Sequence, residues 1–231
     1  MVGPTDHINS PVLILGVPRS GTSLVTGLLA LNGLWVGRTM PGDMSNPRGY
    51  FENVTLREQV NKGLLRQLGY DEFGVQKLPP ATGLPRAAGL RKLVFSTING
   101  EGYDGRQPWG FKDPKLTLTW PIWHQEFPNA RWIIVRRPTN SVIQSCLRTP
   151  FMRRHSADPK FWRRFVAEYD QRLDRMQSAG LWLRRIRASE IIDGQLDRIA
   201  ALAKDLGLDW NQDFAQEFVD RQLWRDPEGV S

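Results

Sequence analysis

The sequence predicts a three-layer α/β/α protein built around a central parallel sheet. Short, continuous runs of branched apolar residues are typical of strands that are buried on both faces. Segments with helical spacing alternate with these runs, as in folds whose parallel strands are joined by crossover helices. The chain has 231 residues, of which 40% are hydrophobic, enough for one α/β domain with its own core. We therefore expect residues 1–231 to form a single domain.

The first strand is expected at PVLILGV, residues 11–17, because this run is short, continuous and branched. The helix after it is expected at residues 20–33, where leucines recur at helical spacing and an Asn-Gly pair supplies the stop. A second helix is expected over 55–69, started by Asn53 or Thr55.

The middle of the chain adds two strands. A helix at 85–98 is expected within a segment rich in glycine and proline. The short strand WGFK, residues 109–112, precedes a mostly helical stretch at 116–127 that tolerates Pro121. RWIIVR, residues 131–136, has the composition of another buried strand.

The last third of the chain is expected to alternate helices with one more strand. The helices are placed at 139–148, 159–178, near 193–206 and at 211–221, and the strand LWLRRIR at 181–187. Three segments are expected to be irregular, mobile inserts, because they are rich in glycine, proline and polar residues. These inserts lie near 37–50, 71–108 and 149–158.

Lysine and arginine outnumber aspartate and glutamate by 31 to 24, a formal charge of +7, which favours an anionic partner. The basic residues are spread along the chain instead of forming an arginine-aromatic strip, so we expect no nucleic acid partner.

Cys146 is the single cysteine, which excludes an intrachain disulfide and fits a reducing cytoplasm. The opening MVGPTDHINS lacks the layout of a signal peptide, and no apolar run approaches the roughly 20 residues of a membrane span. We therefore expect a cytoplasmic protein without a membrane span.

A glycine-containing turn, GVPRSGTS, joins the first strand to the first helix. A helix N-terminus exposes unpaired N–H groups and a partial positive charge, and Gly16 and Gly21 let the backbone curl around a bound group. Such a turn can hold a phosphate-type anion. The residues expected to bind this anion are Pro18, Arg19, Ser20, Gly21, Thr22 and Ser23.

The spacing of the two glycines matches the triphosphate-binding loop GxxxxGK[ST], but Thr22 stands where that motif has lysine. The positive charge lies inside the loop instead, at Arg19. This arrangement favours a phosphate-type ligand other than ATP with magnesium. The plainer interpretation is a tight strand-to-helix connection with an exposed arginine.

A second anion site is predicted in VRRPTNSVIQS, residues 135–145, where Arg137 directly follows a strand and Ser145 lies on the next helix. A strand-end arginine and a hydroxyl from the following helix can converge on one phosphate. Taken alone, this turn could equally be a solvated corner. Together with the first turn, it suggests one nucleotide that carries phosphates at both ends of its ribose.

These motifs resemble those of the sulfotransferases that use 3′-phosphoadenosine 5′-phosphosulfate (PAPS). GVPRSGTSL resembles the 5′-phosphosulfate loop of that family, and VRRPTNSVIQS its 3′-phosphate motif, which carries over to Arg137 and Ser145. GFKDPKLTL, residues 110–118, is similar to a segment of the tyrosylprotein branch in which Lys112 takes the place of the catalytic lysine. NPRGYFEN, residues 46–53, resembles a bacterial element that makes Glu52 the candidate base.

The resemblance implies a fold like that of the P-loop nucleotide triphosphatases and a transferase that moves a sulfuryl group in line from PAPS to a hydroxyl or amine, leaving 3′-phosphoadenosine 5′-phosphate (PAP). Arg19, Lys112 and the N–H groups of residues 20–23 would stabilise the leaving phosphate, and Glu52 would take the acceptor's proton. No metal is expected. The histidine that follows the lysine in the cytosolic branch is absent, so His124 and Asp113 stay open as alternative bases.

The acceptor is not indicated by the residues: a carbohydrate, a small metabolite, a lipid head group and a tyrosine are all compatible with the three inserts, which we expect to line its site. Two other functions stay open. One is a P-loop-type nucleotide kinase or NTPase, which the missing lysine argues against. The other is a non-catalytic polyanion-binding protein, which the positive charge alone would allow. Nothing in the sequence indicates an oligomeric state.

Overall fold

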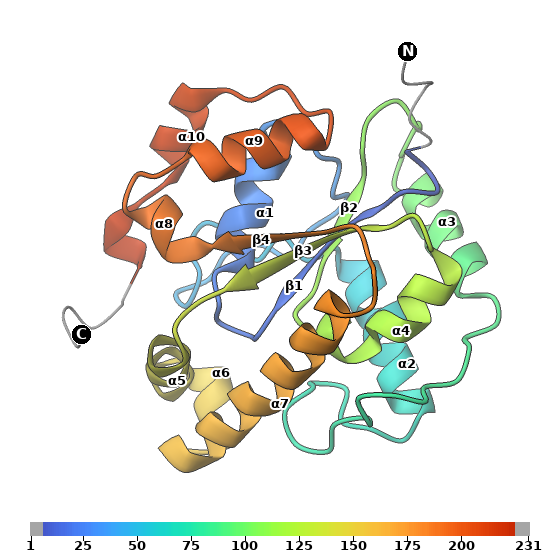
Figure 1. Ribbon diagram of the computed structural model, residues 1–231, viewed down its shortest axis with the longest axis vertical. Helices are drawn as coiled ribbons and strands as arrows, with labels where there is room; N and C mark the ends of the chain where they lie inside the picture. The colour runs from blue at the N-terminus through green and yellow to red at the C-terminus, as the bar shows by residue number, and fades with distance from the viewer. Residues whose placement is uncertain (1–6, 225–231) are drawn as a thin grey trace.

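The computed structural model describes residues 7–224. Four strands form one sheet in the order β2-β1-β3-β4, and every neighbouring pair is parallel (Figure 1). The strands are β1 (Val12–Gly16), β2 (Gly110–Lys112), β3 (Arg131–Arg136) and β4 (Leu183–Arg187). The predicted α/β fold with a central parallel sheet is therefore confirmed. Residues 1–6 form much of the opening stretch MVGPTDHINS, for which no signal peptide is expected, and they lie outside the described residues.

The central strand β1 explains why its sequence is apolar throughout. It pairs with β2 on one side and β3 on the other, and all five of its residues are buried. Val12 and Ile14 pack into the core on one face of the sheet, while Leu13 and Leu15 pack into the core on the opposite face. Alternate residues of a strand point to opposite faces, so a strand covered on both sides needs an unbroken apolar run.

Helices cover both faces of this sheet and complete the three layers (Figure 1). One face carries α1 (Thr22–Leu31), α8 (Ala188–Ile192), α9 (Asp197–Asp205) and α10 (Gln212–Phe218). The other face carries α2 (Lys62–Gln67), α3 (Leu90–Gly100), α4 (Leu116–Glu126), α5 (Thr139–Arg148), α6 (Pro150–Arg153) and α7 (Pro159–Gln177). A π-helical turn, η1 (Leu56–Asn61), leads into α2, and a 3₁₀ turn, η2 (Arg221–Leu223), follows α10.

Some helix predictions need correction. The insert at 149–158 is not irregular throughout, because α6 begins inside it at Pro150, a residue whose fixed φ suits the first turn of a helix. The helix expected near 193–206 is α9, which begins only at Asp197, and a short helix that was not predicted, α8, precedes it at Ala188–Ile192. The backbone of Gly194 has a φ of +84°, which breaks the helical path between them. The insert at 71–108 is irregular except for α3, which begins after Gly89 rather than at 85.

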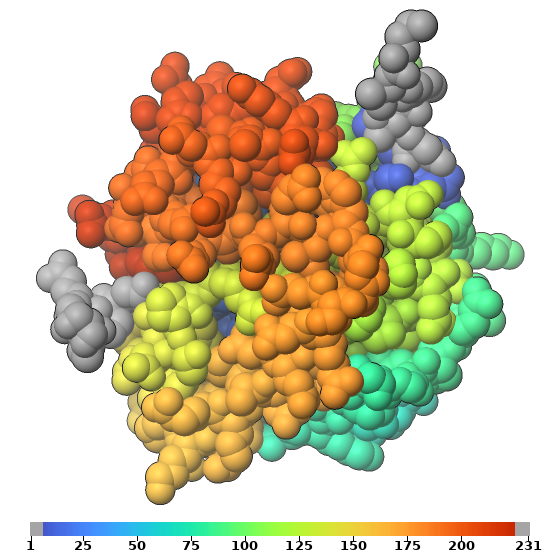
Figure 2. Space-filling view, in the orientation of Figure 1, coloured from blue at the N-terminus to red at the C-terminus, as the bar shows by residue number. Residues whose placement is uncertain are grey.

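The surface shown in Figure 2 is crossed by α7, with a hollow between this helix and α5. The hollow has a volume of about 420 Å³, and its lining includes Thr139, Arg163 and Asp170. A second groove of about 550 Å³ lies between α7 and residues 75–81. Neither lining contains a predicted site residue. Among residues 7–224, no helix has the length and apolar character that a bilayer crossing requires.

Candidate functional site

The turn between β1 and α1 leaves polar groups without a partner among the described residues. Gly21 is the N-cap of α1 with a φ of +94°, and no side chain in the described part of the chain caps this helix. The Ser20 hydroxyl is buried and has no hydrogen-bond partner among the described residues. Buried hydroxyls and helix N-termini are normally satisfied, so the turn has the unmet donors that a bound anion would use.

Backbone packing explains the glycine at position 16. A Cβ there would lie 2.4 Å from the carbonyl oxygen of Val135 and 2.7 Å from Ser20 Oγ. The turn therefore passes against β3, the strand that delivers the second predicted site. Arg19 also has a positive φ, +74°, which is unusual for a residue with a side chain and is typical of binding turns.

The Gly21→Ala variant is expected to lose about 2 kcal/mol of unfolding free energy. The alanine backbone would be held in the left-handed conformation, and its Cβ would lie 2.5 Å from the Ala188 side chain. Gly33→Ala is the matched control: Gly33 has a φ of +101° but open space around its missing Cβ, so about 1 kcal/mol is expected. Urea unfolding of both variants measures the difference. Equal losses would show that α8 does not press on the turn.

The two predicted anion sites meet in one cluster. The Nε of Arg19 donates a hydrogen bond to Ser145 Oγ at 3.1 Å, and Arg137 Nη1 donates to the carbonyl oxygen of Arg19 at 3.1 Å. The contact follows from the sheet order, since β1 and β3 are neighbours and their carboxyl ends lie side by side. Burial lowers the pKa of Arg19 below its usual value, although an arginine stays charged in proteins. Two guanidinium groups and a hydroxyl thus lie together at the start of α1.

Lys112 and Glu52 form the second half of the site. Lys112 ends β2, and its Nζ lies 2.7 Å from Glu52 Oε1, 3.0 Å from the carbonyl oxygen of Tyr50 and 3.2 Å from Ser23 Oγ. The Ser23 hydroxyl in turn donates to the Tyr50 carbonyl at 3.1 Å. Three segments distant in sequence therefore meet at this ammonium group: the β1–α1 turn, the loop before η1 and the end of β2.

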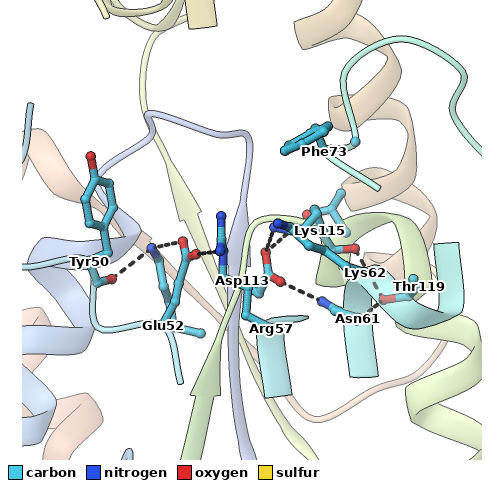
Figure 3. Close-up of polar contacts among 12 residues, drawn as sticks. Tyr50, Glu52, Arg57, Asn61, Lys62, Phe73, Asp113, Lys115 and Thr119 are labelled. Atoms are coloured by element: carbon cyan, nitrogen blue, oxygen red, sulfur yellow. Dashed lines mark hydrogen bonds and ion pairs between the residues drawn. The ribbon is translucent and has the colours of Figure 1, made fainter. Parts of the chain in front are cut away.

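Glu52 is held between two cations. Its second oxygen lies 2.8 Å from Arg57 Nε, and Figure 3 shows the carboxylate between Tyr50 and Arg57. Burial alone would raise the pKa of Glu52, but attraction to Lys112, Lys115 and Arg57 outweighs it and leaves that pKa below the usual value. For Lys112, burial is the larger influence and lowers its pKa despite Glu52. The carboxylate is therefore charged at neutral pH and is a hydrogen-bond acceptor.

The alternative bases lie in different surroundings. Asp113 is fully buried, accepts hydrogen bonds from Asn61 Nδ2 at 3.0 Å and the Lys115 backbone at 2.9 Å, and pairs with Lys115 Nζ at 2.8 Å (Figure 3). These contacts hold the turn between β2 and α4. His124 lies in the last turn of α4, about 12 Å along the helix from its start, and burial lowers its pKa. The structure thus brings Glu52 to Lys112, but not His124.

Two groups in the site were not found by sequence reasoning. Arg57 reaches Glu52 from the π-helical turn η1, and a helical pattern gives no sign of such a turn. Asn61 links Asp113 to α4, since its amide oxygen accepts from Thr119 Oγ1 at 2.8 Å and Trp123 Nε1 at 3.0 Å. An asparagine and an arginine in a polar stretch carry no signal of their own. Arg57 is identified only by its contact with Glu52, and Asn61 only by its contact with Asp113.

Comparisons with known proteins identify the family and the fold. The profile of the sulfotransferase family matches residues 11–212. The fold is similar to that of the sulfotransferase STF9 from Mycobacterium avium, with a TM-score of 0.54, 13% identity, and coverage of 91% of this chain and 67% of that one. For the sulfotransferase STF1 from Mycobacterium tuberculosis, the TM-score is 0.48 at 13% identity, with 92% and 72% covered. No curated protein sequence matches. Within residues 7–224, no three His, Cys, Asp or Glu side chains are grouped to hold a metal ion.

Proposed function

Because this chain belongs to the sulfotransferase family, we propose that it transfers a sulfuryl group from PAPS to a hydroxyl or amine of an acceptor. The observation that carries the proposal is the meeting of Arg19, Arg137 and Ser145 beside the uncapped start of α1. A nucleotide with phosphates at both ends of its ribose needs two such anion sites close together. The Lys112–Glu52 pair adjoins the same turn through Ser23.

The residues present fit such a donor. Ser20, with its unpartnered buried hydroxyl, and the first N–H groups of α1 would hold the 5′-phosphate, together with Pro18, Gly21, Thr22 and Ser23 of the turn. Arg137 and Ser145 would hold the 3′-phosphate, since a guanidinium group can donate two parallel hydrogen bonds to one phosphate. When bound, PAPS supplies an activated sulfuryl group whose bond to the 5′-phosphate oxygen breaks as a bond to the acceptor forms.

Lys112 and Arg19 act on the charge that this exchange creates. Negative charge grows on the leaving phosphate oxygen, so donors aimed at that oxygen lower the barrier more than they stabilise the ground state. Lys112 is buried, at 2% exposed, and its ammonium group is directed by Tyr50 and Ser23. A cation held in a water-poor site needs little rearrangement to act on that oxygen.

Glu52 takes the proton of the acceptor. Its carboxylate is charged and buried, and one of its oxygens faces Lys112. A donor phosphate that attracts Lys112 would weaken that ion pair and raise the pKa of Glu52, so the carboxylate would become a stronger base when the donor is present. Asp113 pairs with Asn61 and Lys115 and makes no hydrogen bond or ion pair with Lys112 among the described residues, so a donor that attracts Lys112 would not free its oxygens.

The acceptor side is assigned to the three inserts. The segment 37–50 already contacts the site, since the Ser45 carbonyl accepts from Arg19 Nη2 at 3.3 Å and the Tyr50 carbonyl accepts from Lys112. Together with 71–108 and 149–158, it would surround a carbohydrate, a small metabolite, a lipid head group or a tyrosine.

The single cysteine, Cys146, is buried as a free thiol, which supports a reducing cytoplasm as the working compartment. Residues 1–231 would act as a single domain.

PAP is expected to raise the melting temperature by roughly 5–10 °C at 100 times its dissociation constant, because a ligand of the folded state stabilises it by about 2.7 kcal/mol at that concentration. Differential scanning calorimetry with PAP, ATP–magnesium and heparin makes the comparison. Stabilisation by ATP–magnesium but not PAP would favour a P-loop kinase or NTPase. Stabilisation by heparin alone would favour a polyanion-binding protein. Transfer from radiolabelled PAPS to an acceptor panel then identifies the acceptor.

A further inference from the structure

The C-terminal segment lies against the proposed nucleotide site. The Trp224 ring stacks on the Arg137 guanidinium group, with 3.9 Å from the guanidinium carbon to the ring centroid. The same ring lies over the β1–α1 turn, since two of its atoms are 3.1 Å from where a Cβ on Gly21 would be. Trp224 therefore contacts both predicted anion sites. It also lies beyond residues 11–212, the part of the chain that the family profile matches.

Several contacts hold this segment, residues 217–224, in place. The Phe218 ring meets the Phe51 ring edge to face at 5.9 Å, next to the residue proposed as the base. Arg48 donates to the Glu217 carbonyl oxygen at 3.4 Å, and its guanidinium group lies 5.2 Å from the Phe218 ring centroid. The side chain of Asp220 accepts from the Gln222 backbone at 2.9 Å and so caps η2. Trp224 thus follows a segment anchored to the loop that carries Glu52.

We propose that Trp224 is a positioning residue of the nucleotide site, which holds the plane of Arg137 so that its edge faces the 3′-phosphate. This inference rests on the proposed function. An aromatic ring that covers one face of a guanidinium group leaves its in-plane N–H groups able to donate. The hydrogen bond from Arg137 Nη1 to the Arg19 carbonyl fixes one edge of that plane, and Trp224 fixes its tilt.

Removing the ring should therefore weaken recognition of one phosphate selectively. A stacked arginine loses less rotational freedom on binding than one that is loose, so the loss falls on the ligand group that Arg137 contacts. If Trp224 instead stacked on the purine, removing its ring would weaken the binding of every adenine nucleotide equally. Comparing PAP with adenosine 5′-phosphate, which lacks the 3′-phosphate, separates these two roles.

The experiment measures dissociation constants of both nucleotides by isothermal titration calorimetry for wild type, Trp224→Ala and Trp224→Phe. Trp224→Ala is expected to weaken PAP binding by about tenfold and adenosine 5′-phosphate by less than about twofold. Trp224→Phe keeps a ring and should recover most of the PAP affinity. In steady-state transfer, KM for PAPS should rise in Trp224→Ala with kcat nearly unchanged, because the 3′-phosphate contact is equal in ground and transition states.

Trp182→Ala is the matched control, because Trp182 stacks on Arg184 at 4.5 Å at the start of β4, the opposite end of the strand from the site. Its PAP affinity should equal that of wild type. The inference is overturned by unchanged PAP affinity in Trp224→Ala, by equal losses for both nucleotides, or by an equal loss in Trp182→Ala. A wild-type protein that binds no PAP would instead overturn the proposed function.

Discussion

Lys112→Met is expected to lower the single-turnover rate of sulfuryl transfer by about 10²–10³-fold, because it removes one preorganised donor to the leaving phosphate. Methionine has nearly the length of lysine and keeps the packing at the end of β2. The charge is lost from a residue that is 2% exposed and contacts Glu52, the Tyr50 carbonyl and Ser23. Rapid quench with saturating labelled PAPS measures the chemical step without product release.

The control for this variant is Lys62→Met. Lys62 is also buried, at 7% exposed, and pairs with a glutamate, Glu58, at 2.9 Å, but it does not contact Glu52. Loss of a buried lysine from a lysine–glutamate pair is therefore common to both variants, and only Lys112→Met removes the donor next to the turn. A rate within tenfold of wild type for Lys112→Met, or an equal loss in Lys62→Met, would refute the catalytic role of Lys112.

Glu52→Gln is expected to reduce the single-turnover rate by about 10²–10⁴-fold, because an amide keeps the shape of the side chain but cannot accept the acceptor's proton. Glu58→Gln is the matched control, since Glu58 pairs with the same Arg57 but does not contact Lys112. Rates near wild type for Glu52→Gln would show that another residue is the base. Asp113 would then be tested before His124, because Asp113 directly follows Lys112 in the chain, whereas His124 lies in the last turn of α4.

The pH dependence of the wild type follows from the lowered pKa of Glu52. In the protein without donor, the carboxylate is still charged at pH 4.5, the pKa of an unperturbed glutamate. Its ion pairs are lost only as the pH falls further, through the lowered pKa of the folded state. The plot of kcat/KM for PAPS against pH, which reports on the free enzyme, should therefore show no loss from Glu52 at or above that pH. An acid limb above pH 4.5 that disappears in Glu52→Gln would contradict the assigned charge state.

Much of the fold followed from local patterns. PVLILGV was predicted as a strand covered on both faces, and β1 is buried along its whole length. The alternation of strands and helices predicted a parallel sheet, which the pairing of β1 with β2 and β3 confirms. Helix ends were less predictable, because they depend on single residues such as Gly89 and Pro150, whose effect a periodic pattern does not show. The roles of the predicted site residues remain predictions.

The sequence by itself determined which groups were available: a glycine turn with Arg19, an arginine after β3, and Lys112 at the end of β2. Each of these motifs lies within a few residues, so local chemistry is enough to identify it. Only the tertiary structure decided which groups meet. The order β2-β1-β3 puts three strand ends side by side, and Ser145 from α5 and Glu52 from the loop before η1 meet Arg19 and Lys112 there. Tertiary packing also stacks Trp224 on Arg137 from a distant part of the chain, and the π-helical turn η1 places Arg57 beside Glu52; no local period encodes either contact.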